Sequence, residues 1–143
     1  MIKMASKPKV YKSIIGNCFG LNIELYFDCN ITMLYGDSGT GKTMLAQIFS
    51  TMTSKYRIKV FDYRDSFSTK QDVTKFLKTS RGYFVVIDNA DILLDKEDRQ
   101  SICLNDSNQY LIIGRQPKGL LLNKNNFKEL EIANNTIHFS NIF

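Results

Sequence analysis

The stretch GDSGTGKT, residues 36–43, places three glycines, a lysine and a threonine within eight positions. It fits the pattern G-x-x-x-x-G-K-[ST] at every fixed position. The glycines permit backbone angles and close approaches that a Cβ atom would block. The backbone N–H groups of such a loop can turn inward around an anion, and the lysine and threonine then add a cation and a hard oxygen ligand. The stretch therefore predicts a binding site for a polyphosphate.

Each residue of this glycine stretch has an expected role. Lys42 is predicted to reach the β- and γ-phosphates, and the Thr43 hydroxyl is predicted to bind Mg²⁺. The other residues are predicted to surround the phosphates with backbone N–H groups and with the N-terminus of the following helix. The predicted nucleotide-binding residues are Gly36, Asp37, Ser38, Gly39, Thr40, Gly41, Lys42, Thr43 and Met44.

Strands and helices alternate on both sides of the glycine stretch. Residues 31–36 form a short, mostly apolar strand, and apolar residues recur at helical spacing from Lys42 onward. Further strands are predicted at 57–63, 83–88 and 109–114, with helices between them. This alternation predicts an α/β fold with a mainly parallel, five-stranded sheet and helices on both faces.

Both ends of the chain show the period of two that is typical of strands. Residues 10–15 and 20–27 predict an antiparallel hairpin, and residues 127–143 predict a second hairpin that turns at Asn134 and Asn135. We expect these hairpins to be additional elements beside the central sheet. A chain of this length, with no evident linker, predicts a single domain over residues 1–143.

The run YFVVIDNAD, residues 83–91, is apolar and ends in polar and acidic residues. Asp88 is predicted to hold Mg²⁺, usually through water, while Thr43 binds it directly. Asn89 follows, and an amide can position a water molecule but cannot accept its proton. Asp91 is either a substitute base or a cap for the next segment. These residues predict slow intrinsic hydrolysis or hydrolysis that requires a partner.

Arg115 comes directly after another apolar strand, residues 109–114. Ligands of parallel sheets bind at the carboxyl ends of the strands, where Gly36, Asp88 and Gly114 are all predicted to lie. Arg115 is therefore either in position to contact the γ-phosphate through charge-assisted hydrogen bonds or an exposed loop residue. The predicted catalytic residues are Lys42, Asn89, Asp91 and Arg115.

The segments GDSGTGKT, VVIDNAD and LIIGR together resemble P-loop NTPases of the additional-strand class, especially AAA+ and STAND ATPases. The resemblance implies a three-layer sandwich in which the strand ending at Gly114 lies between the glycine-stretch strand and the Asp88 strand. It also implies ATP and Mg²⁺ as cofactors, and a protein partner or self-association that completes the site. The chain departs from the family because no glutamate follows Asp88 and no lid domain is expected.

Three other functions agree with parts of the sequence. A small P-loop kinase can have this size, but the arginines do not cluster in the sequence as they would in a lid. A GTPase is suggested by Asn123 and Lys124, although Asn126 stands where an aspartate would pair with guanine. An interaction protein that is only stabilised by nucleotide would have the same features as a nucleotide-dependent switch.

Composition limits the remaining possibilities. The formal net charge is +5, and four lysines precede the first acidic residue, Glu24, which favours either a nucleic-acid partner or a solvated basic end. The three cysteines form no C-x-x-C pair, so neither zinc nor a disulfide framework is expected. No apolar run has the length of a membrane span and no secretory signal is evident, so we expect no membrane association and a cytoplasmic location.

Overall fold

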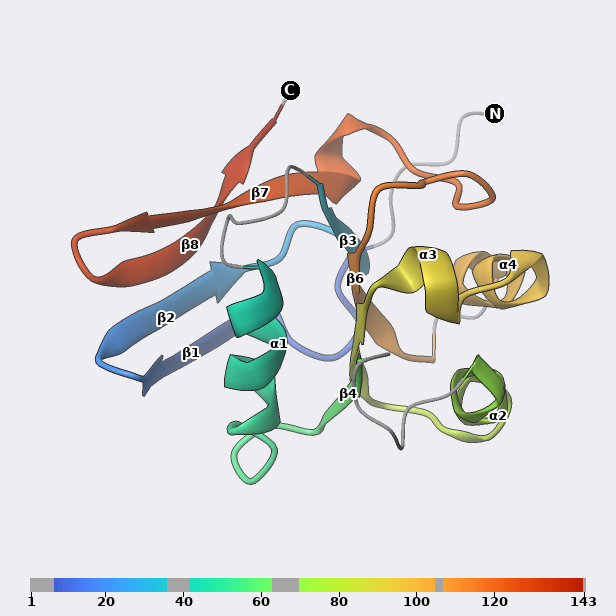
Figure 1. Ribbon diagram of the computed structural model, residues 1–143, viewed down its shortest axis with the longest axis horizontal. Coiled ribbons are helices and arrows are strands. Elements are labelled where there is room, and N and C mark those ends of the chain that lie inside the picture. Colours follow the sequence, from blue (N-terminus) through green and yellow to red (C-terminus); the bar gives the residue numbers. More distant parts are fainter. Residues whose placement is uncertain (1–6, 36–41, 63–69, 105–106, 143) are drawn as a thin grey trace.

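The computed structural model describes residues 7–35, 42–62, 70–104 and 107–142. These residues form an α/β fold with one eight-stranded sheet, in the order β1-β2-β8-β7-β3-β6-β5-β4 (Figure 1). The strands are β1 (Ser13–Cys18), β2 (Leu21–Tyr26), β3 (Ile31–Leu34), β4 (Ile58–Asp62), β5 (Phe84–Asp88), β6 (Gln109–Ile113), β7 (Phe127–Ala133) and β8 (Thr136–Asn141). The helices are α1 (Lys42–Ser50), α2 (Lys70–Thr79), α3 (Ala90–Leu93), α4 (Lys96–Leu104) and the 3₁₀-helix η1 (Lys124–Asn126).

Five neighbouring strands, β7-β3-β6-β5-β4, run parallel to one another. Every residue of β5 and β6 is buried, which agrees with strands that are covered on both faces. Strand β6 lies between β3 and β5. This confirms the strand order that the family resemblance implied.

The predicted mainly parallel, five-stranded sheet with hairpins beside it is only partly correct, because the described residues place both hairpins in the same sheet, which is mixed and has eight strands. The β1–β2 and β7–β8 hairpins both form, and the second turns at Asn134 and Asn135, whose positive φ angles suit asparagine. Strands β2 and β8 then pair with each other in parallel, at Asn22 with Thr136 and Ile23 with Ile137. The hairpins are thus joined into the main sheet, since unpaired strand edges would leave backbone groups without partners.

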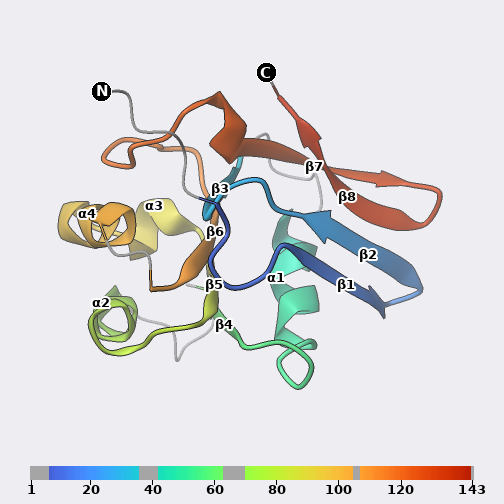
Figure 2. The same ribbon diagram turned by 180° about the vertical axis from the view of Figure 1, so that it is seen from behind.

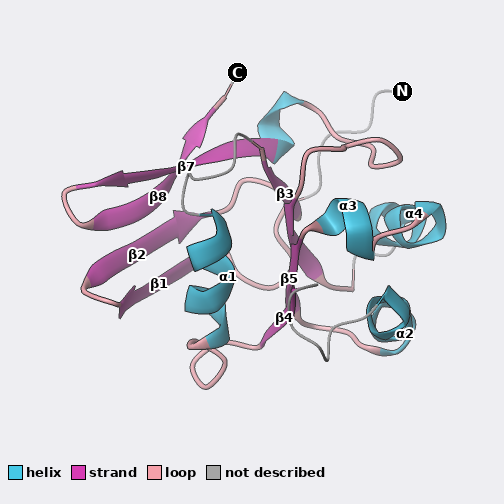
Figure 3. Ribbon diagram, viewed as in Figure 1, coloured by secondary structure: helices cyan, strands magenta, loops and turns pink. Residues whose placement is uncertain are grey.

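Helices cover both faces of the parallel strands, with α1 on one side and α2, α3 and α4 on the other (Figures 1 and 3). The sheet curls around α1, so that Leu45 and Ile48 of this helix share a buried cluster with Ile23 and Ile137 of the hairpins. The opposite face has its own buried cluster, to which Val73 of α2 contributes. No helix in the described ranges is long and apolar enough to span a bilayer.

Helix α4 begins with a reciprocal pair of hydrogen bonds. The Asp98 N–H donates to Asp95 Oδ1 at 2.8 Å, and the Asp95 N–H donates to Asp98 Oδ2 at 3.1 Å. The Thr74 hydroxyl of α2 donates to the other carboxylate oxygen of Asp98, Oδ1, at 2.8 Å. The start of α4 is thereby fixed both to its own first turn and to α2, as in a capping box.

Candidate functional site

The carboxyl ends of four parallel strands are aligned in one row. Leu34 of β3 is in register with Ile113 of β6, Ile113 is in register with Asp88 of β5, and Asp88 is in register with Asp62 of β4. The glycine stretch begins two residues after Leu34, and the segment with Gly114 follows Ile113 directly. The sequence therefore brings the glycine stretch, Asp88 and the loop after β6 to the same edge of the sheet, where ligands of such sheets bind.

Part of the predicted nucleotide-binding set lies outside the described residues. This applies to Gly36, Asp37, Ser38, Gly39, Thr40 and Gly41. Lys42 and Thr43 belong to the first turn of α1, although their side chains are not described. The Met44 side chain is partly buried and packs against the core cluster around α1. Its backbone N–H, one of the first in the helix, is thus the group that remains for the predicted phosphate contact.

Two carboxylates stand side by side in the aligned row. Asp88 is buried, with 4% of its surface exposed, and Asp62 is half-buried on the neighbouring strand, about 5 Å away between backbones. Asp62 is absent from the residues predicted from the sequence, although its strand ends in aspartate just as β5 does. The described residues contain no group of three or more His, Cys, Asp or Glu side chains that would hold a metal alone. One or two carboxylates nevertheless fit Mg²⁺, which is usually bound together with phosphates and water.

Asn89 has a left-handed backbone conformation, with φ 55° and ψ 50°. Its carbonyl oxygen accepts hydrogen bonds from the N–H groups of Ile92 at 3.0 Å and Leu93 at 3.2 Å, so the turn starts α3 directly. Asparagine tolerates this conformation better than glutamate because its short polar side chain can bond locally. The backbone thus gives a physical reason for Asn89 at the position where the resemblance to P-loop NTPases implies glutamate.

Asp91 connects α3 to the loop after β6. Its Oδ2 accepts a hydrogen bond from the Arg115 N–H at 3.0 Å, and its Oδ1 accepts one from the Gln116 N–H at 3.0 Å. A Cβ atom on Gly114 would lie only 2.9 Å from Asp91 Oδ1, so the loop approaches this close because residue 114 is glycine. Asp91 was predicted as a base or as a cap, and the geometry shows a carboxylate whose two oxygens hold backbone groups.

Arg99 of α4 also binds the loop after β6. Its side chain is buried, with Nη2 3.6 Å from Asp91 Oδ1, and its Nη1 donates to the carbonyl oxygens of Gln116 and, at 2.9 Å, of Lys118. Gly119, with φ +84°, packs against the aliphatic part of Arg99. No role for Arg99 was predicted from the sequence, because a contact between α4 and a distant loop leaves no periodic signal.

Arg115 combines a fixed backbone with an available side chain. Its N–H is held by Asp91. Its side chain is exposed and forms no hydrogen bond or ion pair with any residue that the structure describes. The row places this loop beside β5, whose last residue is Asp88. The guanidinium is thus free to meet an anion at this edge.

The segment considered as a guanine-reading element is occupied by its own hydrogen bonds. The Asn123 side chain accepts from the Asn125 N–H at 2.9 Å, and the Asn126 side chain accepts from the Asn123 N–H at 2.9 Å. The Asn126 side chain also donates to the Ile31 carbonyl oxygen at 2.7 Å. These amides cap η1 and fasten it to β3, so they are not presented to a base.

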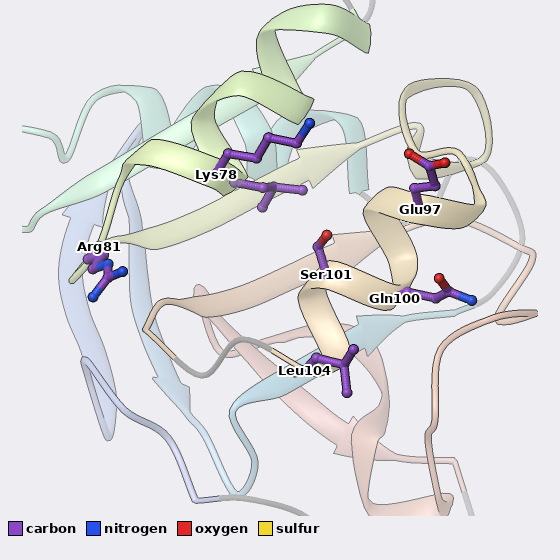
Figure 4. Close-up of a pocket in the computed structure, with 7 residues that line it drawn as sticks. Lys78, Arg81, Glu97, Gln100, Ser101 and Leu104 are labelled. Carbon is purple, nitrogen blue, oxygen red and sulfur yellow. The ribbon is translucent and has the colours of Figure 1, made fainter.

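A pocket lies between α2 and α4 (Figure 4). None of its lining residues belongs to the aligned row or to the loop after β6, so it is a separate feature of the surface. It is lined by Leu77, Lys78, Arg81, Glu97, Gln100, Ser101 and Leu104.

Comparison with known proteins gives one match. Residues 32–112 match the sequence profile of the family described as "ATPase family associated with various cellular activities (AAA)". The match covers more than half of the chain and runs from β3 to β6, so it includes the glycine stretch and Asp88. Neither the search of curated proteins nor the search of solved structures gave a match.

Proposed function

The chain belongs to the AAA family of ATPases, and we propose that it binds ATP together with Mg²⁺ and hydrolyses it slowly or only with a partner. In this proposal the protein is a nucleotide-dependent switch or a component of an assembly. The observation that supports it most is the alignment of Leu34, Ile113 and Asp88, which gathers the ends of β3, β6 and β5 at one edge.

Each group at this edge has a defined task in the proposal. The glycine stretch and Lys42 hold the phosphates, and Thr43 and Asp88 hold Mg²⁺, whose charge would stabilise the negative charge that develops during phosphoryl transfer. Arg115, whose side chain is free among the described residues, contacts the γ-phosphate. Binding energy at this contact would distinguish ATP from ADP, which is what a switch requires.

Slow hydrolysis follows from the groups near the attacking water. Asn89 can orient a water molecule but cannot take its proton. Both oxygens of Asp91 already accept hydrogen bonds from the backbone of the loop after β6, which leaves this carboxylate poorly available to water. A partner protein or a second copy of the chain would therefore supply the missing base.

Nucleotide retention is the first test. The purified chain is incubated with Mg²⁺ and ATP, desalted, and the retained nucleotide is identified by chromatography, with GTP as a competitor. We expect intact ATP at close to one per chain and little effect of GTP. Steady turnover above about 1 s⁻¹ would contradict slow hydrolysis, and preferential retention of GTP would contradict the choice of ATP.

Two matched variants test the metal-binding carboxylate. Asp88→Asn removes the charge of the residue assigned to Mg²⁺, and Asp62→Asn removes the charge of its neighbour in register. We expect the first variant to lose the Mg²⁺-dependent part of ATP retention and the second to keep most of it. A larger loss in Asp62→Asn would transfer the metal-binding role to Asp62.

A further inference from the structure

The opposite edge of the sheet, at the amino ends of β4, β5 and β6, carries a group of tyrosines and cations that the nucleotide site does not use. Arg57 directly precedes β4, and Tyr83 directly precedes β5. We call the group the basic tyrosine cluster. It consists of Tyr11, Lys55, Tyr56, Arg57, Arg81 and Tyr83.

Arg57 is the centre of the basic tyrosine cluster. Its guanidinium lies over the ring of Tyr83, 4.1 Å from the ring centroid, and its Nη2 donates to the Arg81 carbonyl oxygen at 3.4 Å. Its backbone N–H donates to the hydroxyl of Tyr11 at 2.7 Å. These contacts fix an exposed guanidinium in one position, so a ligand would have less side-chain freedom to restrict on binding.

Tyr11 and Tyr56 extend the cluster toward the first hairpin. Their rings meet edge to face with centroids 5.0 Å apart, and Lys55 Nζ lies 5.5 Å from the centroid of Tyr56. The N-terminal segment 7–12 crosses this edge on its way to β1, held where the N–H groups of Val10 and Tyr11 donate to Gln109 Oε1 (Figure 2). This segment adds further exposed cations. They are Lys7, Lys9 and Lys12.

The described segments at this edge supply cations and no acidic residue of their own. The structure describes no acidic residue within 7–13, 51–60, 79–84 or 107–109, while Asp106 lies outside the described residues. Arg81 also lies apart from Glu97, the acidic residue of the pocket between α2 and α4 (Figure 4). A surplus of cations over acids creates a positive potential that attracts polyanions.

The basic tyrosine cluster is separate from the nucleotide site. Tyr83 and Asp88 stand at opposite ends of β5, about 16 Å apart at the rise of an extended strand. A phosphate chain bound at the glycine stretch would therefore lie too far away to contact the cluster. An anion bound at the cluster would thus be a second ligand, distinct from the nucleotide.

We propose that the basic tyrosine cluster and segment 7–12 bind the phosphate backbone of nucleic acid without reading its sequence. Lysine, arginine and tyrosine side chains are typical donors to phosphate oxygens. Arg57 already covers Tyr83, and Tyr11 and Tyr56 pack against each other, so the rings position the cations instead of stacking on bases.

An acidic protein is the less suitable partner for this edge. Protein interfaces usually centre on exposed apolar or aromatic anchors that become buried. The large exposed hydrophobic side chains of the described chain lie outside segments 7–12, 55–57 and 81–83. An edge that offers cations from three segments, and no apolar centre, fits a phosphate backbone better.

Fluorescence anisotropy of the full chain tests the proposal. The probes are a labelled 20-nucleotide single strand of DNA, the same strand of RNA, and a 20-base-pair duplex of unrelated sequence, each without ATP, at 50 and 200 mM NaCl. We expect binding that depends little on sequence and weakens on the order of 30-fold between the two salt concentrations, as three to four phosphate contacts would give. No binding by the folded protein at 50 mM NaCl would overturn the proposal.

Matched charge reversals separate the cluster from net charge alone. Lys12→Glu with Arg81→Glu changes two exposed cations of this edge, and Lys96→Glu with Lys124→Glu changes two exposed cations elsewhere by the same total charge. We expect about a tenfold or greater loss of affinity in the first pair and less than about a threefold loss in the second. The reason is that affinity depends mainly on the cations that contact phosphates and release their counterions. Equal losses would overturn the proposal, as would poly-glutamate that competes as well as nucleic acid of equal charge.

Discussion

At the scale of single residues, the backbone at Asn89 decides which side chains suit the position after Asp88. Its φ of 55° lies in the left-handed region, where a residue such as glutamate is strained. We expect Asn89→Glu to lower the free energy of unfolding by about 1 kcal/mol and Asn89→Gly to leave it unchanged or slightly higher. Urea denaturation of the two variants measures the difference. Equal stability would show that this turn relaxes without strain.

The same two variants separate strain from chemistry. In the proposed function, glutamate at position 89 would supply the missing base, and general bases contribute about 10²- to 10⁴-fold to rates. We therefore expect Asn89→Glu to raise steady-state ATP hydrolysis about tenfold or more, even though the fold is weakened. Asn89→Gly should show no such increase. Unchanged turnover in Asn89→Glu would mean that the slow step is not proton transfer at this residue.

Asp91 is expected to matter for the stability of the loop after β6. Asp91→Ala would remove the acceptors for the N–H groups of Arg115 and Gln116 and leave the buried Arg99 without its carboxylate. We expect a loss of about 1–3 kcal/mol in unfolding free energy, and a smaller loss in Asp91→Asn, which keeps one acceptor oxygen. Chemical denaturation measures both. An Asp91→Ala variant as stable as the parent would contradict the structural role.

At the scale of secondary-structure elements, the start of α4 depends on Asp95. The hydrogen bond from the Asp98 N–H holds the pKa of Asp95 below its usual value. The stabilisation is therefore fully present above the unfolded pKa of about 3.9 and is lost as the pH falls through the lower folded value. We expect Asp95→Ala to cost about 1 kcal/mol at neutral pH, as helix-cap substitutions do.

Asp95→Asn is the control for this pH dependence, because its amide oxygen can accept the same hydrogen bond but does not titrate. We expect the parent chain to lose stability relative to Asp95→Asn when urea unfolding is repeated at pH 7 and pH 3. The comparison removes the effect of the other carboxylates, which titrate in both proteins. A constant difference at the two pH values would exclude a contribution from Asp95 ionisation.

At the scale of the whole molecule, the sequence predicts what is local and misses what depends on distant pairing. Period-two alternation correctly indicates both hairpins, and the family resemblance correctly places β6 between β3 and β5. Neither reveals that β2 pairs with β8, because register between distant segments leaves no mark on either one. Asp62 and Arg99 are missed for the same reason, since each acquires its neighbours only through the tertiary fold.

The pairing of β2 with β8 joins the two hairpins and extends the sheet around α1. Ile23 and Ile137 are in register, fully buried, and share the core cluster with α1. Ile137→Ala should therefore cost about 2–4 kcal/mol of unfolding free energy, a loss typical of a buried isoleucine. Ile132→Ala, at a position 47% exposed in the same hairpin, should cost less than about 0.5 kcal/mol. Similar costs at the two positions would mean that the C-terminal hairpin folds without packing on α1, and that the nucleotide-binding half of the sheet is stable without it.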